Sequence, residues 1–110
     1  RQPRIVARLR ELDADVVCLQ EVETALWAEL QCELERLGYD SILQDSRSRV
    51  ANAVLFKRGR VQCVRVESRS RALLTVLRSC NDNQDLAEPL YLANVHLEAG
   101  VDKAASRFLQ

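Results

Sequence analysis

Several features that mark common protein classes are missing from this chain. No apolar run approaches the roughly 20 residues that a membrane-spanning helix needs, and we expect no membrane segment. No apolar segment follows the charged start in the way that a signal peptide requires. The single histidine and the four cysteines, which form no CxxC pair, argue against a structural zinc site. A Gly-rich phosphate loop and a Ser/His/Asp set for nucleophilic catalysis are also absent.

The composition is that of a globular protein. The chain of 110 residues is 47% hydrophobic and 29% charged, without repeats or low-complexity tracts. It lacks an initiator Met and ends in what reads as an interrupted helix, so we expect a piece of one longer domain. Cys18 and Cys63 have apolar neighbours and are predicted to be buried thiols. Nothing marks a secreted protein, and we expect an intracellular location, cytoplasmic or nuclear.

Charge is balanced overall but not along the chain. The formal net charge is zero, yet residues 47–78 carry nine basic groups and one acid, Glu67. A basic surface of this kind could face phosphate. The alternative is a set of solvated strand faces and turns, because only residues that are contiguous in space make a patch.

Hydrophobic periodicity predicts an α/β or α+β arrangement. Apolar spacing indicates an amphipathic helix over 3–12 and a second one that Thr24 caps and Gly38 ends. The run at 14–20 reads as a central strand buried on both faces. Gly59 permits a tight reversal between two later strands, and the second of these is expected to carry a bulge or to be buried on both sides. Further strands are expected at 39–44, 50–58, 60–68, 71–79 (where a helix is also tolerated) and 90–97, with a polar loop at 80–89 and a last helix at 101–110.

Glu21 raises a question because it follows an apolar strand. Ligand groups commonly lie at the carboxyl ends of strands in open α/β sheets. A carboxylate held there by rigid backbone suits Mg²⁺, which prefers oxygen ligands and keeps several waters. The alternative is that Glu21 is only the first solvated residue after a buried strand.

His96 and Asn94 form the second candidate pair. Both lie near the end of the strand expected at 90–97, and residues two apart in a strand point to the same face. An imidazole can donate a hydrogen bond to phosphate or transfer a proton near neutral pH. The alternative is a core histidine with a backbone partner. Asn52, Lys57, Arg58 and Arg107 are weaker candidates, and each could be structural.

Four stretches together resemble the endonuclease/exonuclease/phosphatase superfamily, in its deadenylase-like (nocturnin/Angel-type) branch. They are "DADVVCLQEV", "NAVLFKR", "LANVHL" and "SRFLQ", in which Val95 replaces the threonine of that branch. The resemblance implies a four-layer α/β sandwich with two mixed sheets. It also implies a metal-ligating role for Glu21 and a phosphate-contacting role for His96, with Asn94 as its local support in the phosphate- and substrate-binding site. Arg107 and Gln110 match positions that we interpret as structural.

The activity implied by the resemblance is hydrolysis of phosphodiester bonds that depends on Mg²⁺, with Mn²⁺ as an alternative. RNA is the expected partner, and a 3′–5′ exoribonuclease of the deadenylase type is the expected function. Two other readings stay open: a non-catalytic member of the fold that acts as an interaction module, and a phosphodiesterase for a small-molecule or lipid phosphate. Residues 1–110 then form a partial domain, in which the family's first strand and C-terminal half are missing, so we expect this fragment alone to be inactive.

Overall fold

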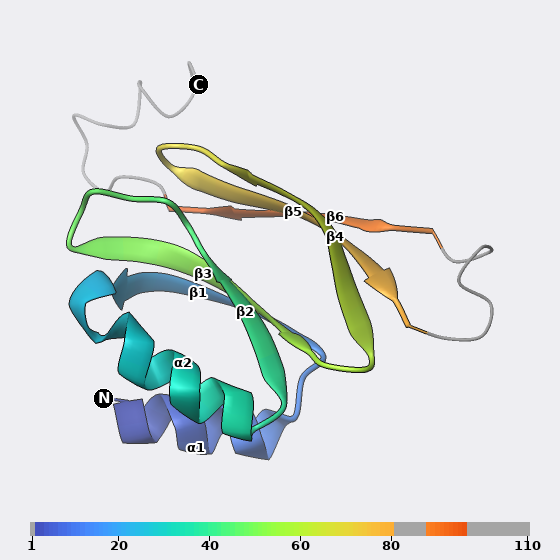
Figure 1. Cartoon of the computed structure of the whole chain (residues 1–110), viewed down its shortest axis with the longest axis horizontal. Coiled ribbons are helices and arrows are strands. Elements are labelled where there is room, and N and C mark those ends of the chain that lie inside the picture. The colour runs from blue at the N-terminus through green and yellow to red at the C-terminus, as the bar shows by residue number, and fades with distance from the viewer. Residues whose placement is uncertain (1, 81–87, 97–110) are drawn as a thin grey trace, which may run out of the picture.

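Two helices and two antiparallel sheets make up the computed structural model of the chain, which describes residues 2–80 and 88–96 (Figure 1). The helix expected at 101–110 lies outside these residues, as does most of the loop expected at 80–89. The elements are α1 (Gln2–Leu12), β1 (Val16–Glu23), the 3₁₀ turn η1 (Thr24–Leu26), α2 (Trp27–Arg36), β2 (Tyr39–Leu43), β3 (Val50–Lys57), β4 (Val61–Ser68), β5 (Ala72–Ser79) and β6 (Leu90–Val95).

The described elements form three layers. Both helices cover one face of the first sheet, and the second sheet lies over its other face (Figure 1). The first sheet has the order β1-β3-β2 and the second β4-β5-β6, and every described pairing is antiparallel. The α/β architecture with two stacked sheets is therefore confirmed. Within the described residues the mixed pairing that the resemblance implies is not seen.

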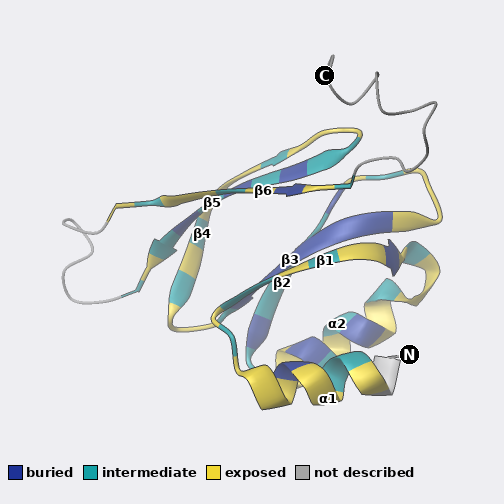
Figure 2. Cartoon of the chain, turned by 180° about the vertical axis from the view of Figure 1, so that it is seen from behind, coloured by how far each residue is buried: buried dark blue, intermediate teal, exposed yellow. Residues whose placement is uncertain are grey.

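The central strand is β3, and the prediction that residues 14–20 are central and buried on both faces is wrong. β3 pairs with β1 and β2 and lies between the helices and the second sheet, so its residues 51–56 are all buried (Figure 2). β1 pairs only with β3 in the described part of the chain. Cys18 on β1 is consequently exposed rather than buried, and Cys63 is half-buried. An apolar run alone did not distinguish an edge strand from a central one.

The helices pack through part of the apolar faces that the spacing predicted, because Leu12 and Leu26 are exposed. Leu9 of α1 and Leu30 and Leu34 of α2 are buried against Ala53 and Leu55 of β3. Gly38, with φ 92°, ends the second helix in a conformation that side chains with a Cβ disfavour. Each large apolar side chain that is fully buried contributes about 1.5–3 kcal/mol to stability. The packing of the helices on β3 is therefore the main source of stability on the helix side.

Thr24 does not cap α2, contrary to the prediction. It begins η1, and its hydroxyl lies 3.3 and 3.2 Å from the carbonyl oxygens of Ser48 and Arg49. Its backbone N–H also donates to Arg49. Thr24 therefore joins the end of β1 to the loop before β3, which closes one end of the first sheet.

The strands of the second sheet form largely as the sequence predicts. Gly59, with φ 86°, makes the reversal between β3 and β4. The register of β4 against β5 shifts between Cys63 and Arg65, which confirms the expected bulge. The segment expected at 71–79 forms the strand β5 (Ala72–Ser79) and not a helix, and Leu73, Thr75 and Leu77 alternate inward and are buried.

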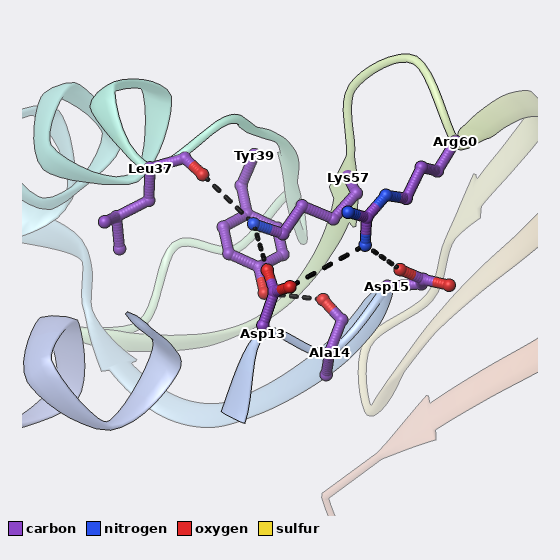
Figure 3. A network of polar contacts seen from close by, with 7 residues as sticks. All are labelled: Asp13, Ala14, Asp15, Leu37, Tyr39, Lys57 and Arg60. Carbon is purple, nitrogen blue, oxygen red and sulfur yellow. Dashed lines mark hydrogen bonds and ion pairs between the residues drawn. The ribbon is translucent and has the colours of Figure 1, made fainter. Parts of the chain in front are cut away.

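A network of polar contacts joins the connection between α1 and β1 to the end of β3 and the start of β2 (Figure 3). Lys57 Nζ lies 2.7 Å from Asp13 Oδ1, 3.2 Å from the carbonyl oxygen of Leu37 and 4.6 Å from the centre of the Tyr39 ring. The Tyr39 hydroxyl donates a 2.5 Å hydrogen bond to the carbonyl oxygen of Ala14, and burial raises its pKa. Lys57 therefore serves the fold and not a ligand.

Neither described helix has the length and apolar character that crossing a bilayer requires.

Candidate functional site

Glu21 lies in a bulge of β1. Leu19 pairs with Ala53 and Val22 with Ala51, so two β1 residues, Gln20 and Glu21, stand opposite a single residue of β3. Glu21 has φ 55°, the left-handed conformation that is uncommon for residues other than glycine. The bulge turns its carboxylate away from the core, where the side chain is 68% exposed.

His96 follows the last residue of β6 and meets Glu21. Its Nε2 atom lies 3.6 Å from Glu21 Oε1, across 75 residues of sequence. This distance is too long for a hydrogen bond, but it places the two functional groups in one site. The backbone N–H of His96 donates to the carbonyl oxygen of Arg71 at 3.0 Å, which fixes the backbone of His96 beside the start of β5. The two candidate residues therefore lie side by side, while their chemical roles stay predictions.

Asn94 supports the site from within, and its place in the phosphate- and substrate-binding site stays a prediction. The side chain is 3% exposed. Its Nδ2 atom donates to the carbonyl oxygens of Leu19 at 3.0 Å and Ala53 at 2.9 Å. Both amide hydrogens are thus used on backbone of the first sheet. Asn94 fixes the bulge of β1 against β6, which is a positioning role.

Two further amides that the sequence did not single out for this role complete the connection between the sheets. Asn52 is 1% exposed and donates from Nδ2 to the carbonyl oxygen of Asn94 at 3.0 Å, so it is not the strand-start cap that its position allowed. Gln44 accepts from the Asn52 N–H at 3.0 Å and donates to the carbonyl oxygen of Arg69 at 2.6 Å. The sequence signal for this role was Asn52, a polar residue inside an apolar strand, because a buried amide requires hydrogen-bond partners.

A polar cleft of about 290 Å³ adjoins His96. Its lining residues come from the end of β2, the β2–β3 loop, the start of β3, the β4–β5 turn and the end of β6; Figure 1 shows the course of these segments. Ser46, Ser48, Ser70, Arg71 and His96 contribute to its wall. Glu21 does not line this cleft, but its carboxylate lies 3.6 Å from the imidazole of His96, a residue that does.

Glu21 fits one position of a Mg²⁺ site. Its exposed carboxylate can give an oxygen ligand, and Mg²⁺ is often bound by only one or two carboxylates with several waters. No group of three or more His, Cys, Asp and Glu side chains in the described residues could hold a metal ion by itself. Glu21 would therefore need further ligands, such as water or substrate oxygens, to hold the ion.

Much of the basic middle of the chain is neutralised at the surface. Lys57 and Arg58, two weaker phosphate candidates, pair with Asp13 and Asp40. Arg60 lies 2.9 Å from Asp15, and this hydrogen bond together with the charge of Asp13 raises the pKa of Arg60. These pairs support the reading of solvated strand faces and turns over that of one continuous basic surface. Arg107 lies outside the described residues.

No family model matches the chain. No curated protein matches it either. Solved structures do match. The crystal structure of ANGEL2, a 2′,3′-cyclic phosphatase, in complex with adenosine-2′,3′-vanadate, has a TM-score of 0.73 and 28% identity over 87% of this chain and 31% of that chain.

Two more distant structures match over nearly the whole chain. The human Nocturnin catalytic domain with bound sulfate has a TM-score of 0.75 and 20% identity, and the match covers 97% of this chain and 45% of that chain. Humanized D. rerio TDP2 with 14 mutations has a TM-score of 0.80 and 19% identity, and the match covers 99% of this chain and 47% of that chain. The chain thus spans less than half the length of the structures it resembles. It has the endonuclease/exonuclease/phosphatase fold, as a partial domain.

Proposed function

We propose that the chain is part of a Mg²⁺-dependent phosphodiester hydrolase that acts on RNA ends, with Mn²⁺ as an alternative metal. The observation that carries this proposal is the 3.6 Å approach of His96 Nε2, directly after β6, to Glu21 Oε1 on β1, a strand of the other sheet. A carboxylate and an imidazole held together beside a polar cleft suit a phosphate group with a divalent ion.

Glu21 is proposed to hold the metal ion, and His96 to donate a hydrogen bond to an oxygen of the scissile phosphate. A bound Mg²⁺ would polarise the phosphate and stabilise the charge that develops on its oxygens. His96 would add one directed donor at the same oxygens. Asn94 keeps the two groups in register through its hydrogen bond to Leu19. The described residues supply no base that could activate the attacking water, and we expect this base elsewhere in the full-length protein.

Two substrates are considered for this site. Removal of nucleotides from RNA 3′ ends follows from the deadenylase-like sequence pattern. Hydrolysis of a 2′,3′-cyclic phosphate at an RNA end is favoured by the likeness to ANGEL2, a protein described as a 2′,3′-cyclic phosphatase. Both reactions hydrolyse a P–O ester bond of ribose, and the same pair of residues could serve either one.

The test compares an oligoadenylate with a free 3′ hydroxyl and one that ends in a 2′,3′-cyclic phosphate. With Mg²⁺ and the full-length protein we expect turnover of one of them, and its loss by a factor of about 100 or more in Glu21→Gln and in His96→Gln. Glu29→Gln, on the exposed first turn of α2, is the matched control and should retain the original rate.

Two results would contradict the proposal. One is turnover that Glu21→Gln and His96→Gln leave unchanged. The other is the absence of turnover on both RNA ends, which would favour a non-catalytic interaction module or a different phosphate ester.

The free thiols of Cys18, Cys32, Cys63 and Cys80 are compatible with the intracellular location that we also propose.

A further inference from the structure

Two side chains donate hydrogen bonds between the sheets in opposite directions, next to the candidate pair. Asn94 of β6 donates to the carbonyl oxygen of Leu19 on β1 at 3.0 Å. Gln20 of β1 donates from Nε2 to the carbonyl oxygen of Val95 on β6. Each of these two side chains therefore binds the backbone of the strand that carries the other one, directly before the two candidate residues.

The bond from Gln20 reaches the peptide group that joins Val95 to His96. The N–H of this group belongs to His96 and donates to the carbonyl oxygen of Arg71 at 3.0 Å, toward the start of β5. Because a planar trans peptide directs its C=O opposite to its N–H, the carbonyl oxygen of Val95 points away from β5. Among the described strands β6 pairs only with β5, and Gln20 supplies the partner on the other side. The peptide plane from which the His96 side chain starts is thus held from both sides.

The bond from Gln20 lies at the surface, in contrast to those of Asn94. Asn94 is 3% exposed, and one of its bonds reaches the buried carbonyl oxygen of Ala53. Gln20 is exposed, so water can replace its amide at the carbonyl oxygen of Val95 when the side chain is shortened. An exposed bond of this kind contributes little to the free energy of unfolding. Its effect is on the orientation of the peptide group that it holds.

We propose that Gln20 is a positioning residue, which holds the peptide group before His96 against β1 so that the imidazole faces the Glu21 carboxylate. The inference rests on the proposed function, in which both groups act on one phosphate. Gln20 and Glu21 are the two residues of the β1 bulge. One bulge residue therefore carries the carboxylate, and its neighbour places the imidazole that lies 3.6 Å from that carboxylate.

The first experiment measures hydrolysis by the full-length protein with Gln20→Met, which nearly keeps the size of the side chain and removes its donor. The substrate is the oligoadenylate end that the parent protein turns over. We expect kcat to fall about ten- to a hundredfold with KM unchanged, because a shift of about 1 Å in a reacting group can have an effect of this size. The midpoint of thermal unfolding should stay at the parental value.

Gln20→Asn distinguishes positioning from a direct contact of the amide with substrate. This variant keeps the amide but shortens the side chain by one methylene group, so that it no longer reaches the carbonyl oxygen of Val95. We expect the same loss of kcat as in Gln20→Met. The matched control is Gln31→Met, which removes a 3.4 Å hydrogen bond between α2 and Ser41 of β2 and should retain the parental kcat.

A second experiment needs no turnover and therefore separates this inference from the proposed function. Nuclear Overhauser effects between the ring protons of His96 and the side-chain methylene protons of Glu21 report their proximity in the substrate-free protein. The ring signals are identified by their loss in His96→Gln. We expect these effects in the parent protein and in Gln31→Met, and their loss in Gln20→Met and Gln20→Asn.

Three results would overturn the inference. Parental Overhauser effects in Gln20→Met would show that the bond does not place the imidazole. A parental kcat in Gln20→Asn, with a loss in Gln20→Met, would indicate that the amide acts on substrate directly. A lower unfolding midpoint in Gln20→Met would indicate a general structural role. Loss of the Overhauser effects in Gln20→Met, in a protein whose parent shows no turnover, supports the positioning of His96 and counts only against hydrolysis.

Discussion

The side-chain amide of Asn94 donates a 3.0 Å hydrogen bond to the carbonyl oxygen of Leu19. Leu19 is the last paired residue of β1 before the bulge that contains Glu21. The same amide also reaches the carbonyl oxygen of Ala53 on β3 at 2.9 Å. One buried side chain of the second sheet therefore fixes the place in the first sheet where the strand departs from regular pairing.

Replacing Asn94 should lower both stability and activity. Asn94→Ala leaves two backbone carbonyl groups without these partners, and each buried unsatisfied group costs about 1–3 kcal/mol. We expect the free energy of unfolding to fall by at least about 2 kcal/mol, measured by denaturant titration. Hydrolysis should fall with it, because the bulge loses the bond that keeps Glu21 beside His96.

Asn94→Asp sharpens this prediction, since it keeps the shape of the side chain and removes both donors. It should be as damaging as alanine near neutral pH. Gln62→Ala, at an exposed position of β4, is the control and should change the unfolding free energy by less than about 0.5 kcal/mol. An Asn94→Asp protein of parental stability would show that the amide bonds contribute little.

Glu21, the proposed metal ligand, has an unfavourable backbone conformation. At φ 55° a residue with a Cβ is disfavoured by roughly 1–2 kcal/mol relative to the right-handed region, whereas glycine is not. Glu21→Gly should therefore be more stable than Glu21→Ala by about 1 kcal/mol in thermal or denaturant unfolding. Both variants should be inactive, because neither carries the carboxylate.

Glu23 provides the matched comparison, because it lies two residues further along β1 with φ −70°. Glycine has no conformational advantage there, so Glu23→Gly should be less stable than Glu23→Ala. The opposite signs at the two positions would identify backbone strain at Glu21. Equal effects at both would contradict it.

The architecture was accessible from the sequence because it depends on local periodicity. Leucines at helical spacing, such as Leu30 and Leu34, and the glycines that end α2 and begin β4 each act through their own backbone. The choice of central strand is different. β1 and β3 are both apolar runs, and only the tertiary position of β3, between two paired strands and between the helices and the second sheet, buries it fully.

The sequence predicted the candidate site only in part, because only some of its features depend on local sequence patterns. Glu21 and His96 could be proposed because each follows an apolar strand. The bulge at Glu21 could not, since it arises from the register of β1 against β3 and from the bonds of Asn94 across 75 residues of sequence. The cleft at Arg71 likewise exists only where three separate segments meet. Tertiary contacts of this kind leave no local pattern.

Tyr39 should be a key residue for the helix side of the fold. It is 0% exposed, its hydroxyl donates to the carbonyl oxygen of Ala14, and its ring lies under the ammonium group of Lys57. Tyr39→Phe keeps the ring and should lower the unfolding free energy by about 1 kcal/mol, the value of one hydrogen bond. Tyr39→Leu also removes the cation–π contact and should be worse by at least about 0.5 kcal/mol. Equal stability of the two variants would exclude a contribution from the ring.

Asp13 should make stability depend on pH in the acid range. Its hydrogen bond with Lys57, followed by the charges of Lys57 and Arg60, lowers the pKa of the Asp13 carboxyl below its usual value (Figure 3). A carboxyl with a lowered pKa in the folded state stabilises the fold above its unfolded pKa, and this contribution is lost as pH falls through the folded pKa. Denaturant unfolding should therefore show the parent more stable than Asp13→Asn at pH 7, with the difference vanishing toward pH 2.

Asn also tolerates the φ of 46° at this position, so the comparison isolates the charge. Asp45→Asn, on the exposed loop after β2, should show no such trend, and a pH-independent difference for Asp13→Asn would rule out the ion pair as its cause.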